Sequence, residues 1–154
     1  MIIRKATIDD TTLLIRLRLD YLLEDGAILV PEEECILRRQ LKDYFSKHLS
    51  NNTFIGILAE VDTHVVAVAY LAISEKPANL SFITGKTGTL LNVLTYLEYR
   101  KQGIATKVLE KLIEEAKLIS VSSIDLSATT EGKYLYKKLG FLVSNYTTMK
   151  LSLM

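Results

Sequence analysis

The residues best suited to chemistry lie close together, where an extended stretch meets the start of a helix. Arg100 and Lys101 supply positive charge there, and Gly103 lets backbone approach a ligand without an intervening side chain. Ala105 is small enough to keep that approach open, and Thr106 adds a hydroxyl. A helix start also offers unpaired backbone N–H groups and the positive end of the helix dipole. The pattern therefore predicts a site for a phosphate or pyrophosphate group.

Two common phosphate-binding motifs are excluded by spacing. The chain contains no G-x-x-x-x-G-K-[ST] sequence, and no G-x-G-x-x-G follows a strand. What remains is the pattern Arg-x-x-Gly-x-Ala, from Arg100 to Ala105, at a strand-to-helix junction.

The N-terminal third of the chain predicts one strand and two helices. Residues 2–6 alternate weakly and predict a short strand. Thr7 and Asp10 resemble a capping box, and leucines at helical spacing follow until about Glu24, where the first helix should end. A second helix opens at Pro31 with three glutamates, which suit the positive end of its dipole. Its apolar stripe consists of Leu37, Leu41, Tyr44, Phe45 and His48.

The hydrophobic period then changes to two. Phe54–Val61 and Val65–Ser74 predict a hairpin with a polar turn at Asp62-Thr63-His64, and Thr89–Leu97 predicts one more strand after them. The most strongly amphipathic helix is Gly103–Leu118, which directly follows the phosphate segment.

The C-terminal part predicts a strand at Ser123–Ala128 and a helix at Glu131–Leu139 that Gly140 stops. One or two closing strands should follow from Phe141 onward. The complete order, βααβββαβαβ(β), indicates a single α/β domain over residues 1–154. It should contain a mixed, twisted sheet with helices on both faces.

Composition sets the limits for function. With 154 residues, 49% hydrophobic and 24% charged, the chain suits one folded domain and not a disordered or low-complexity protein. Its net charge of +1 gives no global field for nucleic acid or an anionic membrane. The longest apolar run, Val65 to Ile73, is far shorter than the ~20 residues of a membrane-spanning helix, and the N-terminus lacks a secretory signal. We therefore expect a cytoplasmic protein that binds neither nucleic acid nor membrane.

Metal chemistry has little support in the sequence. The only cysteine, Cys35, excludes an internal disulfide and a multi-cysteine metal site, and we expect it to be a buried, inert thiol. His48 and His64 have no metal-ligand neighbours at suitable spacing, so we expect structural roles and no bound metal.

Two segments resemble signatures of the GNAT superfamily of N-acetyltransferases. Glu98–Ala105, with the sequence EYRKQGIA, is similar to the family's acetyl-CoA-binding motif, Arg/Gln-x-x-Gly-x-Gly/Ala. Leu135–Phe141, with the sequence LYKKLGF, is similar to a second family signature. Their spacing and the element order also fit, so the resemblance covers almost the whole chain.

The resemblance implies that acetyl-CoA is the cosubstrate and assigns residues to it. The backbone of Val93 and Thr95 would pair with the pantetheine arm, and Arg100 would stand at the entrance of the phosphate loop. Backbone amides of the loop and the first helical turn would hold the pyrophosphate: Lys101, Gln102, Gly103, Ile104, Ala105 and Thr106.

The resemblance also implies a mechanism. A neutral primary amine would attack the acetyl carbonyl directly in a ternary complex, while Tyr136 protonates the departing thiolate as general acid. A backbone N–H near Val93 would polarise the carbonyl. The acceptor would enter between the Glu24–Pro31 loop and C-terminal strands around Asn145-Tyr146-Thr147, where acidic Glu24 and Asp25 favour a cationic amine.

Several points stay open at the level of sequence. Leu97 stands where the family often has proline, and Thr129 stands where an asparagine often contacts the cofactor. The general base is not assigned among Glu24, Asp25 and Glu98. The alternative functions are a non-catalytic acyl-CoA-binding or regulatory module on the same fold and an interaction domain without a ligand. The acceptor amine and the presence of a homodimer are not specified.

Overall fold

A five-stranded mixed sheet forms the centre of the computed structural model, which describes residues 1–154. The strands lie in chain order, and every neighbouring pair is antiparallel except the last, which is parallel. Their bounds are β1 Ile2–Lys5, β2 Phe54–Val61, β3 His64–Glu75, β4 Lys86–Thr95 and β5 Ser123–Asp125. The mixed sheet predicted from the sequence is confirmed.

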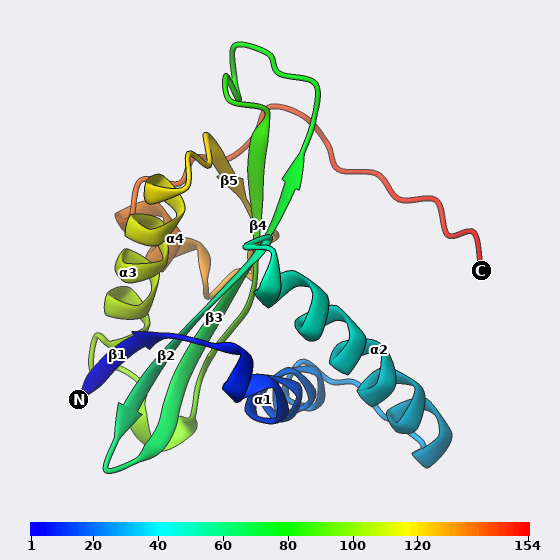
Figure 1. Ribbon diagram of the computed structural model, residues 1–154. Helices are drawn as coiled ribbons and strands as arrows, with labels where there is room; N and C mark the ends of the chain where they lie inside the picture. Colours follow the sequence, from blue (N-terminus) through cyan, green and yellow to red (C-terminus); the bar gives the residue numbers. More distant parts are fainter.

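Helices cover both faces of this sheet, as predicted (Figure 1). On one side lie α1, Thr11–Glu24, and α2, Pro31–Ser50; on the other lie α3, Ile104–Leu118, and the short α4, Lys133–Lys138. Two 3₁₀ turns, η1 at Ile8–Asp10 and η2 at Leu97–Tyr99, precede α1 and α3. None of the helices combines the length and the apolarity that crossing a membrane requires.

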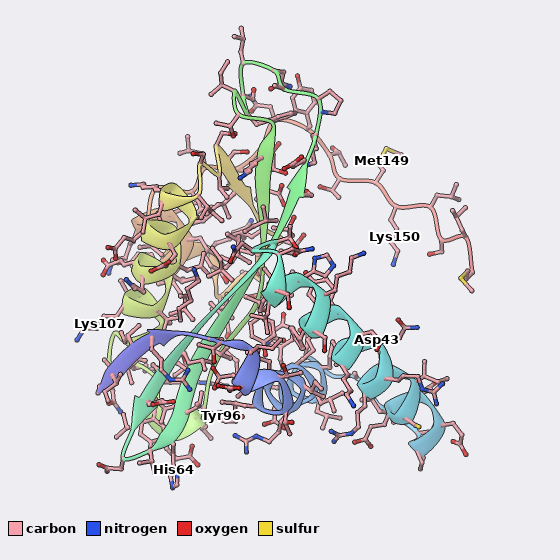
Figure 2. The ribbon with its side chains drawn as sticks, viewed as in Figure 1. Asp43, His64, Tyr96, Lys107, Met149 and Lys150 are labelled. Carbon is pink, nitrogen blue, oxygen red and sulfur yellow. The ribbon has the colours of Figure 1, made fainter.

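The hairpin between β2 and β3 turns more tightly than the sequence suggested. Asp62 and Thr63 both have positive φ, 48° and 68°, which is the backbone of a two-residue turn matched to the twist of the strands. His64 therefore belongs to β3, and Figure 2 shows it at the tip of this hairpin.

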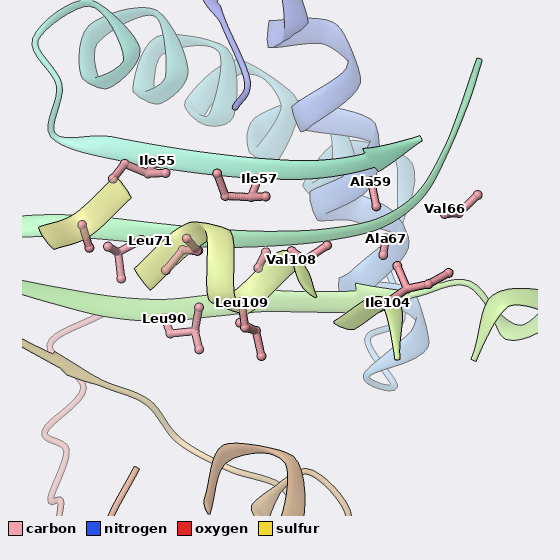
Figure 3. Packing of buried hydrophobic residues seen from close by; sticks show 13 residues of the cluster. Ile55, Ile57, Ala59, Val66, Ala67, Leu71, Leu90, Ile104, Val108 and Leu109 are labelled. Atoms are coloured by element: carbon pink, nitrogen blue, oxygen red, sulfur yellow. The ribbon is translucent and has the colours of Figure 1, made fainter. Parts of the chain in front are cut away.

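The sheet is buried on both faces by two hydrophobic clusters. Alternate residues of β2, such as Ile55 and Ile57, pack toward α3 (Figure 3), whereas Phe54 and Leu58 pack toward α1 and α2. A strand that is buried on both faces needs apolar residues at nearly every position. This explains the continuous apolar run in β3.

The prediction for Cys35 is wrong, because its side chain is exposed. In α2, Phe45 is fully buried and lies on the same face as Leu37 and Leu41, which are partly buried. Cys35 lies two residues before Leu37, a turn of about 200° around the helix, and so points away from that face.

The predicted closing strands are also absent. After α4 the chain passes Phe141 and continues to Met154 without a helix or strand, so β5 remains at the edge of the sheet (Figure 1). The apolar, β-branched composition of this segment favours a strand, but a strand forms only where a partner supplies backbone hydrogen bonds. Here the segment runs away from the sheet.

Candidate active site

A cleft opens where β4 and β5 separate. The two strands pair only from Thr87 to Thr89 and from Ser123 to Asp125, and then diverge. The space between them is a cavity of about 590 Å³, lined by β4, the loop before α3, the segment after β5, and the end of α1.

A β-bulge shapes the β4 wall of the cleft. Asn92 and Val93 of β4 lie opposite the single residue Ala69 of β3, and Asn92 has a φ of 57°. The Asn92 side chain is 1% exposed and connects to α1: its amide donates to the Leu17 carbonyl at 3.4 Å, and its oxygen accepts from Arg18 at 3.2 Å. Because a bulge interrupts regular pairing, it changes which way the neighbouring backbone points, here beside the cavity.

The loop before α3 contains two residues with a left-handed backbone. Lys101 and Gly103 both adopt left-handed conformations, with φ of 60° and 77°. The first backbone bond of the helix runs from the Lys107 N–H to the Gly103 carbonyl, at 3.3 Å, so the amides of Ile104, Ala105 and Thr106 precede it. A Cβ at Gly103 would meet no atom within 4 Å, which leaves open space above the loop.

Arg100 connects the two walls at the entrance of the cleft. Its Nε donates to the Thr95 carbonyl at 2.8 Å, and its guanidinium forms an ion pair with Glu24 at the end of α1. Both side chains are partly exposed. The sequence analysis placed both residues at the site but did not foresee their pairing, because no local pattern links positions so far apart in the chain.

Tyr136 of α4 lines the cleft together with Tyr21, Glu24 and Asp25 from the end of α1. It is half-buried, it lines the cavity, and it packs edge-to-face on Phe141 with ring centroids 5.8 Å apart. Burial raises the pKa of the Tyr136 hydroxyl above its usual value, with a smaller contribution from Tyr21. The phenol therefore keeps its proton at neutral pH.

Thr129 positions the start of α4. Its hydroxyl accepts a hydrogen bond from the Gly132 N–H at 3.1 Å, and both residues line the cavity. A Cβ at Gly132 would lie only 3.1 Å from the Tyr136 ring, so the glycine allows close packing there. The threonine at this position thus caps the turn that carries Tyr136.

Most residues that the sequence assigned to the site do line one cavity: Val93, Thr95, Arg100, Lys101, Gly103, Ile104, Ala105, Thr106 and Tyr136. Gln102 is not among the lining residues, and its side chain donates to the Glu98 carbonyl at 3.3 Å. The sequence analysis missed Tyr21, Ser127 and Glu131, which also line the cavity but belong to no recognisable motif.

The acceptor side agrees with the prediction only in part. Glu24 and Asp25 line the cavity, but Glu98 does not. Residues Asn145–Thr147 form no strand and do not line it, so the prediction that they form a wall is wrong. They lie outside the cavity because the chain after Phe141 turns away from the sheet.

The two histidines lie outside the cavity. His48 stacks on Tyr44 with ring centroids 4.2 Å apart and shares a hydrogen bond with the Thr53 hydroxyl, whereas His64 is exposed. No group of three or more His, Cys, Asp or Glu side chains is arranged to hold a metal ion.

Comparison with known proteins agrees with this geometry. The model of the acetyltransferase (GNAT) family matches residues 16–141. No curated protein matches the chain significantly.

Several solved structures have the same fold. A predicted acetyltransferase from Clostridium acetobutylicum, crystallised with acetyl-CoA, is 31% identical, covers 99% of this chain and 96% of its own, and superposes with a TM-score of 0.87. A GCN5-related N-acetyltransferase from Ralstonia eutropha JMP134 is 22% identical, with 97% of each chain covered and a TM-score of 0.81. Glucosamine-6-phosphate N-acetyltransferase from Arabidopsis thaliana is 20% identical, with 97% of each chain covered and a TM-score of 0.69. The chain, in which β4 and β5 diverge beside the start of α3, belongs to the acetyltransferase (GNAT) family.

Proposed function

We propose that the protein transfers an acetyl group from acetyl-CoA to a primary amine, by direct attack of the amine within a ternary complex. The observation that carries the proposal is the cavity between β4 and β5. It brings the phosphate loop, with Gly103, and the protonated phenol of Tyr136 to the same space.

The phosphate loop would hold the pyrophosphate of acetyl-CoA. Backbone N–H groups from Lys101 to Thr106 would donate to it at the positive end of the α3 dipole. The open space above Gly103 fits this role, because a side chain there would occupy the position of the ligand. The charge of Arg100, at the entrance, would add to the attraction.

The pantetheine arm would lie along β4, against the backbone of Val93 and Thr95. This placement is supported by the divergence of β4 from β5, which leaves that edge of β4 facing the cavity. A backbone N–H near Val93 would then donate to the carbonyl oxygen of the thioester as negative charge develops on it.

Tyr136 would act at the leaving group. As the amine nitrogen bonds to the acetyl carbon, the C–S bond breaks and the electron pair goes to sulfur. The Tyr136 hydroxyl would donate its proton to that sulfur, and the attacking nitrogen would release one of its protons to solvent to give the neutral amide. Tyr136 would then recover a proton from solvent. The burial that raises the pKa of Tyr136 ensures that the proton is present before the reaction begins.

The acceptor would enter from the end of α1, where Tyr21, Glu24 and Asp25 line the cavity. The two carboxylates would favour an amine that carries additional positive charge. The cytoplasmic location expected from the sequence stays a prediction.

The proposal is tested by following the release of free thiol from acetyl-CoA with a panel of primary amines. The Tyr136→Phe variant should lose about 100-fold or more in kcat and retain its affinity for acetyl-CoA, because only the proton donor is removed. Tyr134→Phe is a matched control, since Tyr134 lies on the same helix but is exposed and outside the cavity.

Two results would contradict parts of the proposal. Full activity of Tyr136→Phe would exclude the tyrosine as the acid. Tight binding of acetyl-CoA without thiol release for any amine would instead indicate a non-catalytic acyl-CoA-binding or regulatory module.

A further inference from the structure

Polar side chains of the sheet form hydrogen bonds with α1 at three places. The donors are Tyr70 of β3, Asn92 of β4 and Tyr96, which follows β4. Their partners recur every three residues along the helix, at Leu14, Leu17 and Asp20. Residues at this spacing are neighbours on the helix surface. Of the three donors, only Asn92 lies in the bulge of β4 and lines the cavity, so it alone connects α1 to that wall of the cleft.

The backbone at Asn92 sets the direction of the amide that follows it. Its φ of 57° is left-handed, a conformation that asparagine adopts more readily than most residues with a side chain. Because the peptide unit is planar, the direction of the Val93 N–H depends on the backbone of Asn92. The Asn92 side chain is buried and bonded through both its nitrogen and its oxygen, so it holds that backbone in place.

Arg18 of α1 is the charged partner of the Asn92 side chain. Its guanidinium donates to the Asn92 oxygen at 3.2 Å and lies over the Tyr21 ring, 5.8 Å from the ring centroid. Arg18 is only partly exposed, and no carboxylate forms an ion pair with it. Its position is therefore set by the bulge of β4 on one side and by Tyr21, which lines the cavity, on the other.

We propose that Arg18 and Asn92 are positioning residues for acetyl transfer: Arg18 holds the Asn92 side chain, and Asn92 directs the N–H of Val93 toward the carbonyl oxygen of the thioester. The inference rests on the proposed function, in which a backbone N–H near Val93 donates to this oxygen as negative charge develops on it. Such a donor is most effective when its direction is fixed before the reaction begins. The helix that supplies one wall of the cavity thus also sets the geometry at the reacting carbonyl.

The first test compares the kinetic constants for thiol release. Asn92→Gly tolerates the left-handed backbone but removes the side chain, so kcat should fall at least about tenfold while KM for acetyl-CoA changes by less than about twofold. Tyr96→Phe is the matched control, because it also removes a hydrogen bond to α1 but lies outside the bulge and the cavity. Its kcat should stay within about twofold of the native value. Urea unfolding measures the stability of each variant.

A double-mutant cycle tests whether the two residues act as one unit. Arg18→Met removes the guanidinium, leaves β4 unchanged and should also lower kcat, so it tests the proposal even if Asn92→Gly does not fold. With both substitutions, kcat should fall no further than in Asn92→Gly alone, since each change breaks the same hydrogen bond. Losses that multiply would show that Arg18 does not act through Asn92, and would overturn the proposal.

Infrared spectroscopy of bound acetyl-CoA, isotope-labelled at the acetyl carbonyl, tests the N–H directly and without an amine. A well-directed donor polarises the carbonyl and lowers its stretching frequency. The frequency should therefore be lower in the native protein and in Tyr96→Phe than in Asn92→Gly and Arg18→Met. A merely structural role for the two residues would reduce stability and leave this frequency unchanged.

The outcomes separate this inference from the proposed function. If the native protein releases thiol, an unchanged kcat or carbonyl frequency in Asn92→Gly and Arg18→Met would overturn the positioning role alone. An equal loss of kcat in Tyr96→Phe would do the same, because it would show that any loosening of α1 has this effect. Absence of thiol release from the native protein with every amine would contradict the proposed function, and the positioning role with it.

Discussion

Two residues of the loop before α3, Lys101 and Gly103, adopt left-handed backbone conformations, and only one of them is a glycine. We proposed above that this loop holds the pyrophosphate of acetyl-CoA. The left-handed conformation costs a residue with a side chain about 1–2 kcal/mol. The strained backbone at Lys101 orients the amides of the loop in a particular direction. Gly103 has a different role, because the absence of a side chain leaves that side of the loop free for a ligand.

Replacement of Gly103 by valine should separate these two effects. We expect Gly103→Val to lower the free energy of unfolding by about 1–2 kcal/mol, through backbone strain, and to weaken acetyl-CoA binding at least about tenfold. Isothermal titration calorimetry measures the binding. Gly26→Val is the matched control, since Gly26 has a φ of 96°, equally open surroundings and no place in the cavity. Equal affinity in the two variants would contradict the assigned role of the loop.

The protonation of Tyr136 makes a second prediction at this scale. Because burial raises its pKa above the usual value of about 10, most of the phenol stays protonated up to about pH 9. The kcat of the native protein should therefore not decline between about pH 7 and pH 9, while deprotonation of the acceptor amine favours reaction. A decline in kcat centred near pH 8 in a pH–rate profile would show that another group is the acid.

Among the elements, β1 and the start of α1 are joined by a network around Asp10. Arg4 of β1 donates to both carboxylate oxygens of Asp10, at 2.8 and 2.9 Å, and the Thr7 N–H donates to one of them at 2.8 Å. The hydrogen bonds from Arg4 hold the pKa of the Asp10 carboxyl below its usual value. This network confirms the capping-box pattern seen in the sequence.

The lowered pKa of Asp10 determines how the contribution of its carboxylate to the free energy of unfolding depends on pH. The carboxylate stabilises the fold above its unfolded pKa of about 3.9, and the contribution disappears as the pH falls through the folded value. Asp10→Asn should therefore lower the free energy of unfolding by about 1 kcal/mol at pH 7 and by progressively less below about pH 4. Urea unfolding measures the difference. Asp9→Asn should show no such trend, and a gap that widened toward low pH would contradict the account.

The end of α1 makes a prediction about the acceptor. Glu24 pairs with Arg100, whereas no ion pair involves Asp25, and both line the cavity. We expect Asp25→Asn to raise KM for a diamine several-fold, by removal of one attractive charge, and to leave KM for a monoamine of equal length almost unchanged. Steady-state assays at low salt measure both values. Equal kcat/KM for neutral and polycationic acceptors in the native enzyme would exclude a cationic preference.

For the whole molecule, the sequence predicted what local periodicity controls. β2 and the end of α1 at Glu24 fall where expected, and α3 begins within one residue of its predicted start. Contacts between residues far apart in the chain could not be predicted from the sequence. The bulge at Asn92 is held by hydrogen bonds to α1, and the ion pair of Arg100 with Glu24 depends on how α1 packs. The prediction of closing strands after Phe141 was wrong for a third reason. The sequence pattern of this segment favours a strand, but it cannot specify which sheet edge would pair with it.

The same distinction applies to the proposed function. The loop before α3, the backbone of β4 and the Tyr136 hydroxyl line one cavity because β4 and β5 diverge. This divergence is a property of the whole fold and not of any local sequence pattern. A crystal structure of the native protein with acetyl-CoA is the most direct test. The account predicts a diphosphate bonded to the amides of residues 101–106, with the thioester lying between the β4 backbone and the Tyr136 hydroxyl. A ligand bound elsewhere, or a diphosphate held only by side chains, would contradict it.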